Sequence, residues 1–116
     1  MAIMIKIYHN TRCSKSRECY AILESKNVKF ATVKYMDETL SEKELREIIS
    51  LLKIKPIELV RVGEADWKTN YKGKELSDDE IINAMLDNPK LIERPIVINN
   101  GTAVIGRPPS KVLSIL

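Results

Sequence analysis

Apolar side chains alternate with other side chains at the start of the chain. In the run IMIKIY over residues 3–8, three isoleucines occupy every second position. A period of two predicts a strand with one strongly apolar face. The segment from Ser14 to Lys26 favours a helix, because Cys19, Ile22 and Leu23 recur at helical spacing and Asn27 can stop it. Residues 30–35 are β-branched and aromatic and predict a second strand, which completes a right-handed βαβ unit.

Two later helices are indicated by capping boxes, in which a serine accepts a hydrogen bond from a backbone N–H and a glutamate three residues later reaches back. The boxes run from Ser41 to Glu44 and from Ser77 to Glu80, and apolar residues at helical spacing follow each of them. The second helix is expected to end at Asn88-Pro89. Between the two, Pro56 predicts a short helix through residue 60, and residues 62–76 are predicted to be irregular.

The last third of the chain has the pattern of a hairpin followed by a helix. Residues 95–98 and 103–105 predict short strands around the turn signal NNGT, and PPS at 108–110 opens a final helix that ends at Leu116. Parallel strands joined by a helix, then an antiparallel hairpin and a closing helix, form the thioredoxin-like α/β arrangement. We therefore predict one domain over residues 1–116, with a mixed sheet and a helical insertion at about 40–90 between the βαβ unit and the C-terminal ββα unit.

Composition and charge narrow the class of protein. The chain has 116 residues, 44% of them hydrophobic, and 19 basic against 16 acidic residues for a net charge of +3. That charge is too small to indicate nucleic-acid binding, and no apolar run approaches the roughly 18 residues of a membrane span. The start MAIMIKIYH lacks the features of a signal peptide. We expect a cytoplasmic monomer with free cysteines, no bound cofactor and no metal.

Candidate chemistry is concentrated in the stretch YHNTRCSKSR, residues 8–17. Cys13 falls between the first strand and the first turn of a helix, where unpaired N–H groups and the helix dipole favour a thiolate and can hold an oxyanion. Arg12, Lys15 and Arg17 add positive potential, as would His9 if it were protonated. Ligands in α/β sheets of this kind sit at the carboxyl ends of the parallel strands, where Cys13 lies.

Several other interpretations of these residues are weaker. If Cys13 were a small core side chain, its polar neighbours would have to be buried with it at a high cost. Cys19, in contrast, lies on the apolar stripe of the helix and suits core packing. A lone histidine is usually an ordinary loop residue, and His9 gains interest only from its nearness to Cys13. A metal site of His9, Cys13 and Cys19 has no usual zinc spacing and no fourth ligand. A C-x-x-C redox site is excluded as well, because Ser16 stands where its second cysteine would be and no internal disulfide can form.

Three arginines each stand beside a short apolar element: Arg61, Arg94 and Arg107. Alone, each would be read as a solvated surface residue. In a thioredoxin-like fold, however, Pro95 would be cis and would pack against the cysteine loop, which brings Arg94 close to Cys13. Arg107 precedes the final helix at the same edge, and Arg61 comes from the inserted helices. All three are candidates to bind an anion held at Cys13, because guanidinium groups suit tetrahedral oxyanions.

The order and spacing of these motifs resemble the arsenate reductases of the glutaredoxin-dependent, thioredoxin-fold family. YHNTRCSKSR is similar to that family's Y-H-N-x-x-C-x-x-S-R opening, LIERPIVI to its L-I-x-R-P-I-V segment, and GRP at 106–108 to its closing R-P. The resemblance implies Cys13 as the nucleophile, His9 as a residue that favours its thiolate, and Ser16 as a hydroxyl beside it. It also implies Arg61, Arg94 and Arg107 as oxyanion binders.

The resemblance implies a reaction as well. The Cys13 thiolate would attack arsenate and expel water, glutathione would attack the adduct, and glutaredoxin would resolve the mixed disulfide. Two alternatives stay open. A redox-sensing transcriptional regulator that binds RNA polymerase would typically carry C-x-x-C and lack the third arginine, while Ser16 and Arg107 are present here. A general thiol oxidoreductase would need Cys13 but not three arginines.

Overall fold

The chain folds into two compact units. The computed structural model describes residues 5–38 and 40–116. One unit comprises the residues up to Glu38 together with Arg94–Leu116, and we call it the sheet unit; the other, Thr39–Glu93, is the helical unit. The helical unit is thus an insertion into the sequence of the sheet unit, close to the expected bounds of 40–90. That the whole chain acts as one domain stays a prediction.

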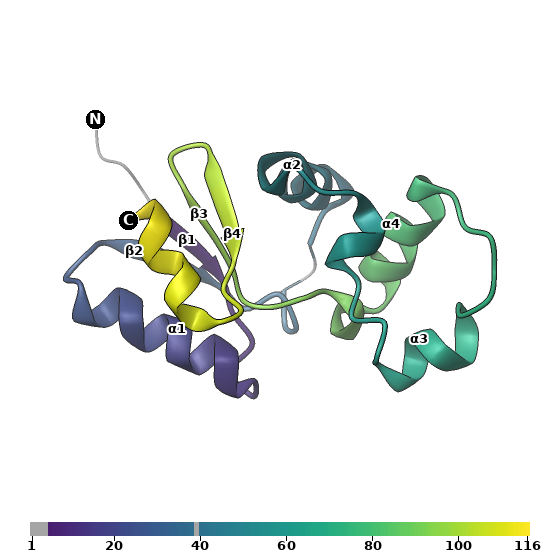
Figure 1. Cartoon of the computed structure of the whole chain (residues 1–116), viewed down its shortest axis with the longest axis horizontal. Helices are drawn as coiled ribbons and strands as arrows, with labels where there is room; N and C mark the ends of the chain where they lie inside the picture. Colours follow the sequence, from purple (N-terminus) through teal and green to yellow (C-terminus); the bar gives the residue numbers. More distant parts are fainter. Residues whose placement is uncertain (1–4, 39) are drawn as a thin grey trace. The chain divides into compact units, whose positions relative to one another are not determined.

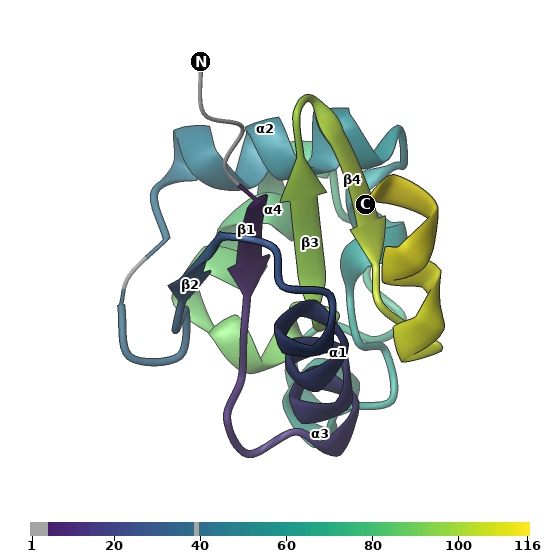
Figure 2. The same ribbon diagram turned by 90° about the vertical axis from the view of Figure 1, so that its left-hand side faces the viewer.

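The sheet unit has the predicted thioredoxin-like α/β architecture. Its elements are β1 (Ile5–Tyr8), α1 (Ser14–Ser25), β2 (Phe30–Val33), β3 (Ile96–Asn99), β4 (Thr102–Ile105) and the 3-10 helix η3 (Pro109–Ile115). The strands form one mixed sheet in the order β2-β1-β3-β4 (Figure 2). β1 is parallel to β2 and antiparallel to β3, and β3 is antiparallel to β4. The predicted βαβ unit and C-terminal hairpin are therefore confirmed.

Local signals account for where these elements end. Asn27, the predicted stop of α1, has a left-handed backbone with φ 56°, and so do the two hairpin residues Asn100 (φ 50°) and Gly101 (φ 80°). Positive φ at both central positions is what a two-residue type I′ hairpin requires, and Asn-Gly meets it at little steric cost. Ile3, the first predicted residue of the opening strand, lies outside the described residues.

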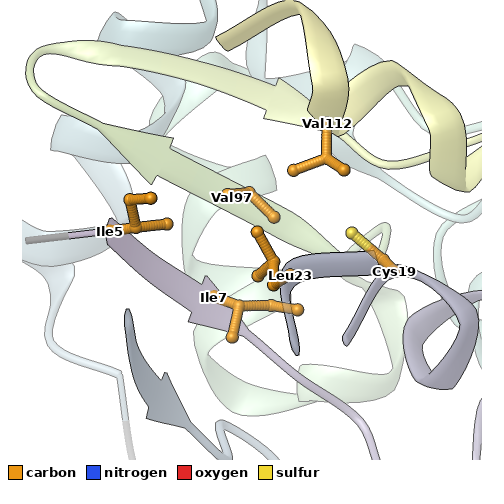
Figure 3. Packing of buried hydrophobic residues seen from close by; sticks show 6 residues of the cluster. All are labelled: Ile5, Ile7, Cys19, Leu23, Val97 and Val112. Carbon is orange, nitrogen blue, oxygen red and sulfur yellow. The ribbon is translucent and has the colours of Figure 1, made fainter. Parts of the chain in front are cut away.

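The core of the sheet unit lies between one face of the sheet and two helices. Ile5 and Ile7 of β1 point to the same face because strand side chains alternate. Val97 of β3 joins them, and side chains of α1 and η3 complete the cluster (Figure 3). The side chains that make it up are Ile5, Ile7, Cys19, Leu23, Val97 and Val112. The alternating isoleucines of the first strand therefore face this core, as the sequence pattern predicted.

The helical unit contains the two helices with serine caps (Figure 1). Its elements are α2 (Glu42–Leu52), η1 (Pro56–Leu59), α3 (Ala65–Asn70), α4 (Asp78–Asp87) and η2 (Pro89–Leu91). Ser77 and Glu80 form the complete capping box at α4. At α2 the Oγ of Ser41 accepts from the N–H of Glu44 at 3.0 Å. Pro56 is the first residue of η1, as predicted.

The expectation that residues 62–76 are irregular is wrong for one stretch. α3 forms there although its sequence, ADWKTN, is largely polar. The helix is stabilised by one buried side chain, Trp67, whose ring stacks on that of Tyr71 at a centroid distance of 5.2 Å. A single aromatic anchor has no periodicity, so hydrophobic patterning does not detect a helix of this kind.

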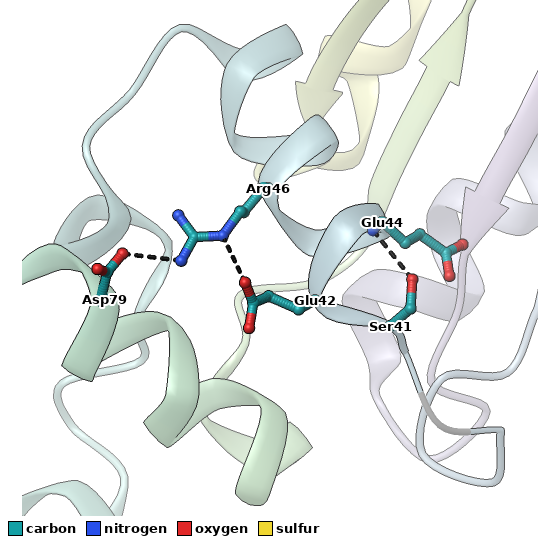
Figure 4. Close-up of polar contacts among 5 residues, drawn as sticks. All are labelled: Ser41, Glu42, Glu44, Arg46 and Asp79. Atoms are coloured by element: carbon teal, nitrogen blue, oxygen red, sulfur yellow. Dashed lines mark hydrogen bonds and ion pairs between the residues drawn. The ribbon is translucent and has the colours of Figure 1, made fainter.

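One arginine links two helices of the helical unit. Arg46 of α2 donates from Nε to Glu42 on the same helix at 3.0 Å and from Nη2 to Asp79 of α4 at 2.7 Å (Figure 4). All three side chains are largely exposed. Exposed ion pairs contribute little to stability, so the buried apolar residues hold α2 against α4. Within residues 5–38 and 40–116, no helix is long and apolar enough to cross a membrane.

Candidate active site around Cys13

Cys13 is the N-cap residue of α1, with an extended backbone before the first helical turn. The loop that delivers it is built around Asn10. The carbonyl of Asn10 accepts from the N–H of Cys13 at 3.0 Å, and its side-chain Oδ1 accepts from the N–H of Arg12 at 3.0 Å. The carbonyl of Cys13 then accepts the first helical bond, from Arg17 at 3.0 Å. The thiol is thereby held where unpaired N–H groups of the helix point toward it.

A buried polar pair supports this loop from within. Nδ1 of His9 and Oγ of Ser16 are hydrogen-bonded at 2.6 Å, and the same Oγ accepts from the N–H of Asn10 at 3.0 Å. His9 is 6% exposed and Ser16 is fully buried. The His9 ring also stacks on Tyr20 of α1 at a centroid distance of 5.0 Å. The structure thus brings two of the predicted site residues, His9 and Ser16, into direct contact beside the Cys13 loop.

Two arginines from the C-terminal segment of the sheet unit reach the sulfur. Nη2 of Arg107 donates to Cys13 Sγ at 3.6 Å, and Nε of Arg107 donates to the carbonyl of Arg94 at 2.8 Å. The guanidinium of Arg94 also hydrogen-bonds to Cys13 and interacts with the buried hydroxyl of Tyr35. Both arginines precede cis-prolines, Pro95 and Pro108, and the predicted cis Arg94-Pro95 bond is present.

These neighbours change the acidity of the thiol. Burial by itself would raise the pKa of Cys13. Hydrogen bonds from the backbone N–H of Ser16, from the Arg94 side chain and from the N–H of Lys15 outweigh it, together with the charge of Arg94, and lower the pKa below its ordinary value. A cysteine in such surroundings is a stronger candidate nucleophile than an ordinary one, because the thiolate is the reactive form.

The surroundings of His9 favour the neutral form of its ring. Burial, and then the positive charges of Lys34 and Arg17, lower the pKa of His9. Its ring is therefore neutral near pH 7, with one nitrogen as donor and the other as acceptor. The contact of His9 with the cysteine loop is its hydrogen bond to Ser16.

Cys19 is remote from this chemistry. It is fully buried in the core of the sheet unit, and burial raises its pKa to about 11. Gly106 packs directly against it: a Cβ at that position would lie 2.9 Å from Cγ of Pro95 and 3.1 Å from Sγ of Cys19. The glycine before Arg107 is therefore a requirement of close packing between the hairpin, the cis-proline and α1.

Arg61 belongs to the helical unit. Its Nη1 lies 3.4 Å from Oε2 of Glu64, and its Nε lies 3.3 Å from Oε1 of Glu93. These three residues line a depression of about 370 Å³ together with Val60, Val62 and Gly63. The backbone there is tied down by Arg61 N–H, which donates to the carbonyl of Leu91 at 2.7 Å. The predicted part of Arg61 in anion binding stays a prediction.

Three residues of the site were not singled out from the sequence. Asn10 shapes the cysteine loop, Tyr35 interacts with Arg94, and Gly106 permits the packing beneath Arg107. Asn10 had a detectable signal, because Asn before a helix start commonly caps backbone N–H groups with its side chain. Tyr35 had none, since an aromatic residue after a strand is usually part of the core.

The arrangement joins a thiolate-favouring cysteine, helix N–H groups and two guanidinium groups. It suits nucleophilic attack on an electrophile that carries negatively charged oxygens. Over the described parts of the chain, no group of three or more His, Cys, Asp or Glu residues could hold a metal ion. Fold and site together define a thioredoxin-like protein with an activated cysteine.

Comparison with known proteins places the chain within one family of that class. The ArsC family model matches residues 8–115, and the chain belongs to the ArsC family. A relative in Haemophilus influenzae named arsenate reductase is 42% identical over 95% of this chain and 97% of its own length. The uncharacterized protein YfgD of Escherichia coli is 44% identical over 100% of this chain and 99% of its own length. A solved structure described as arsenate reductase from Vibrio cholerae superposes with a TM-score of 0.93 at 42% identity, over the whole of both chains.

Proposed function

We propose that this protein reduces arsenate to arsenite with Cys13 as its nucleophile. The observation that carries the proposal is the environment of the Cys13 sulfur, which Arg107 approaches to 3.6 Å and whose pKa is lowered by Ser16, Arg94 and Lys15 despite burial. Membership in a family with relatives named arsenate reductase supports arsenic as the target of the thiolate.

The first step forms a sulfur–arsenic bond. The Cys13 thiolate attacks arsenic, one As–O bond breaks, and the oxygen leaves as water after taking up protons. The guanidinium groups of Arg94 and Arg107 stabilise the charged oxygens while that bond breaks. Arg61 is proposed as a third oxyanion binder on the family resemblance. Ser16 and His9 hold the loop, and hence the sulfur, in place through their buried hydrogen bond.

The second step transfers two electrons to arsenic. Glutathione thiolate attacks the Cys13 sulfur, and the electron pair of the S–As bond passes to arsenic. As(V) thereby becomes As(III), and a mixed disulfide between Cys13 and glutathione forms. Glutaredoxin then reduces this disulfide. We assign resolution to an external thiol because Cys19 is fully buried and its pKa of about 11 disfavours the thiolate form. Such thiols are supplied in the cytoplasm, the proposed location.

The test is arsenite production by the purified protein with arsenate, glutathione, glutaredoxin and a glutathione-recycling system. We expect turnover in the wild type and none in Cys13→Ser. Thioredoxin with its reductase, in place of glutathione and glutaredoxin, is the control for the reductant. Equal turnover with thioredoxin would overturn the assignment of glutathione. No arsenite in either system, with Cys13 still alkylated rapidly, would overturn the proposed reaction.

A further inference from the structure

Charge is distributed unevenly between the two units. The sheet unit carries ten basic and four acidic residues, a net charge of +6. The helical unit carries nine basic and twelve acidic residues, a net charge of −3. The chain-wide value of +3 therefore conceals a strongly positive unit. That positive unit is the one that carries Cys13.

Four exposed basic side chains of this unit surround the cysteine loop, and we call them the basic rim: Arg12, Lys15, Arg17 and Lys34. Arg12 precedes Cys13, and Lys15 lies in the first turn of α1. Arg17 folds back over the loop, because its Nη1 donates to the carbonyl of Thr11 at 3.4 Å.

Lys34 reaches the loop from β2. It follows Val33, whose carbonyl accepts from the N–H of His9 at 2.8 Å. The Lys34 charge also acts on the His9 ring, as does that of Arg17. Two segments of the sheet unit therefore contribute to the basic rim.

The basic rim is scarcely neutralised and is not needed to hold the sulfur. In the described part of the chain, its one ion pair is that of Lys15 with Glu18 at 3.7 Å, between side chains that are about half exposed. The side chains that bind the sulfur are those of Arg94 and Arg107. Four exposed cations that the thiol itself does not require point to a second anionic species that approaches from solvent.

We propose that the basic rim recruits small, carboxylate-bearing thiols to the Cys13 sulfur and makes the resolution of Cys13 adducts selective for anionic thiols. This rests on the proposed function only in that a thiol must remove the group bound to Cys13. Glutathione, with two carboxylates, belongs to this chemical class. Charge complementarity is the argument: a carboxylate thiol is drawn toward the loop, a neutral thiol is not, and a cationic thiol is repelled.

The experiment uses a simple adduct in place of arsenic. The thiolate of the partly exposed Cys13 attacks the sulfenyl sulfur of methyl methanethiosulfonate, methanesulfinate leaves, and the methyl disulfide of Cys13 forms. An added thiolate attacks the methylthio sulfur, the S–S bond breaks, and Cys13 leaves as a thiolate while a mixed disulfide of the two small thiols forms. Attack on the Cys13 sulfur instead expels methanethiolate, and a second thiol completes the reduction. In either course one disulfide is reduced for each one formed.

The three probes are 3-mercaptopropionate, 2-mercaptoethanol and cysteamine, which carry an anionic, a neutral and a cationic group beside the thiol. Release of the methylthio group is followed by mass spectrometry. Each rate is divided by the rate at which the same thiol reduces a small neutral disulfide in the same buffer, which cancels differences in thiolate fraction and in intrinsic nucleophilicity. The rim variant, Lys15→Gln/Arg17→Gln/Lys34→Gln, removes three of the four charges of the basic rim. The matched control, Lys26→Gln/Lys29→Gln/Lys111→Gln, removes the same charge from exposed positions of the same unit. Lys26 and Lys29 lie beyond the C-terminal end of α1, roughly 18 Å along the helix from Cys13.

We expect the anionic thiol to react about tenfold faster than the cationic thiol in the wild type and in the control. The ratio should fall toward one in the rim variant, which retains Arg12, Arg94 and Arg107, and should fall further in 1 M salt, where the Debye length is about 3 Å. A change in the pKa of Cys13 affects all three thiols alike, so the ratio reports recruitment alone. Equal rates for the three thiols in the wild type, or equal loss of the ratio in rim variant and control, would overturn the proposal. Because no arsenate is present, either result is independent of the proposed reductase activity.

Discussion

Nη2 of Arg107 lies 3.6 Å from Sγ of Cys13, although the two residues are 94 positions apart in the chain. The same guanidinium donates from Nε to the carbonyl of Arg94 at 2.8 Å. Arg107 thus connects the residue before one cis-proline to the cysteine loop at the start of α1. Its position depends on the hairpin between β3 and β4, which carries it back to the edge where Cys13 lies.

Replacing Arg107 should make Cys13 less reactive. Loss of a hydrogen bond from a charged group disfavours the thiolate, so the pH profile of alkylation should move to higher pH in Arg107→Ala. Such hydrogen bonds are worth about 1.5–3 kcal/mol. Because the site is partly solvated, we expect an effect near the lower limit of that range. This corresponds to an alkylation rate at pH 7 that is about tenfold lower. The rate of Cys13 alkylation by iodoacetamide between pH 5 and 10 measures this change. Arg107→Lys keeps the positive charge and should retain part of the wild-type rate. An unchanged profile would mean that Arg94 and the helix N–H groups suffice.

The two cysteines should differ sharply in the native protein. Cys13 is partly exposed with a lowered pKa, whereas Cys19 is fully buried with a pKa of about 11. Iodoacetamide at pH 7 should label Cys13 within minutes and Cys19 only after denaturation, as peptide mass spectrometry will show. Cys19→Ser should produce arsenite from arsenate at the wild-type rate in the assay of the proposed function. If that variant is folded but inactive, Cys19 takes part in turnover and the proposed glutathione step is wrong.

Ser16→Ala should destabilise the fold. The substitution removes the partner of two buried groups, Nδ1 of His9 and the N–H of Asn10. A buried polar group left without a partner costs about 1–3 kcal/mol. Urea unfolding should show a loss in that range, while Ser14→Ala, at an exposed position in the same helical turn, should cost much less. Equal losses in the two variants would show that the buried pair contributes no stability of its own.

Gly106→Ala should also be destabilising, for a steric reason. The added methyl group would lie 2.9 Å from Pro95 and 3.1 Å from the Cys19 sulfur. Overpacking of this kind typically costs about 1–3 kcal/mol. A Cβ at Gly63 would have no atom within 4 Å, so Gly63→Ala is the matched control. Its unfolding midpoint in urea should be close to that of the wild type. Wild-type stability in Gly106→Ala would contradict the packing described.

Arg61 provides a test of the third guanidinium. If it binds the oxyanion, Arg61→Ala should lower arsenate turnover at least tenfold, as loss of a group that stabilises transition-state charge does. The rate of Cys13 alkylation should not change. Glu93→Gln removes one of its two carboxylate partners and should leave the protein active. A fall in turnover matched by a fall in alkylation would mean that Arg61 supports the fold and not the substrate.

Much of the sheet unit could be predicted from residues that act locally. The isoleucine alternation of β1, the serine caps of α2 and α4 and the Asn-Gly turn of the hairpin depend on neighbours a few positions away. The position of Cys13 at the start of a helix follows in the same way. Such signals are readable because backbone preferences and hydrogen-bond caps act within a turn or two of the chain.

Other features depend on groups far apart in the sequence. α3 is stabilised by one buried tryptophan in a polar segment, and Gly106 is required by a sulfur 87 positions away. The neutral state of His9 follows from burial and from the charge of Lys34. The amino-acid sequence by itself therefore determined the order of the elements apart from α3, and the place of Cys13 at the start of a helix. Only the tertiary structure decided which charges and hydrogen bonds surround Cys13, because burial and distance set their strength.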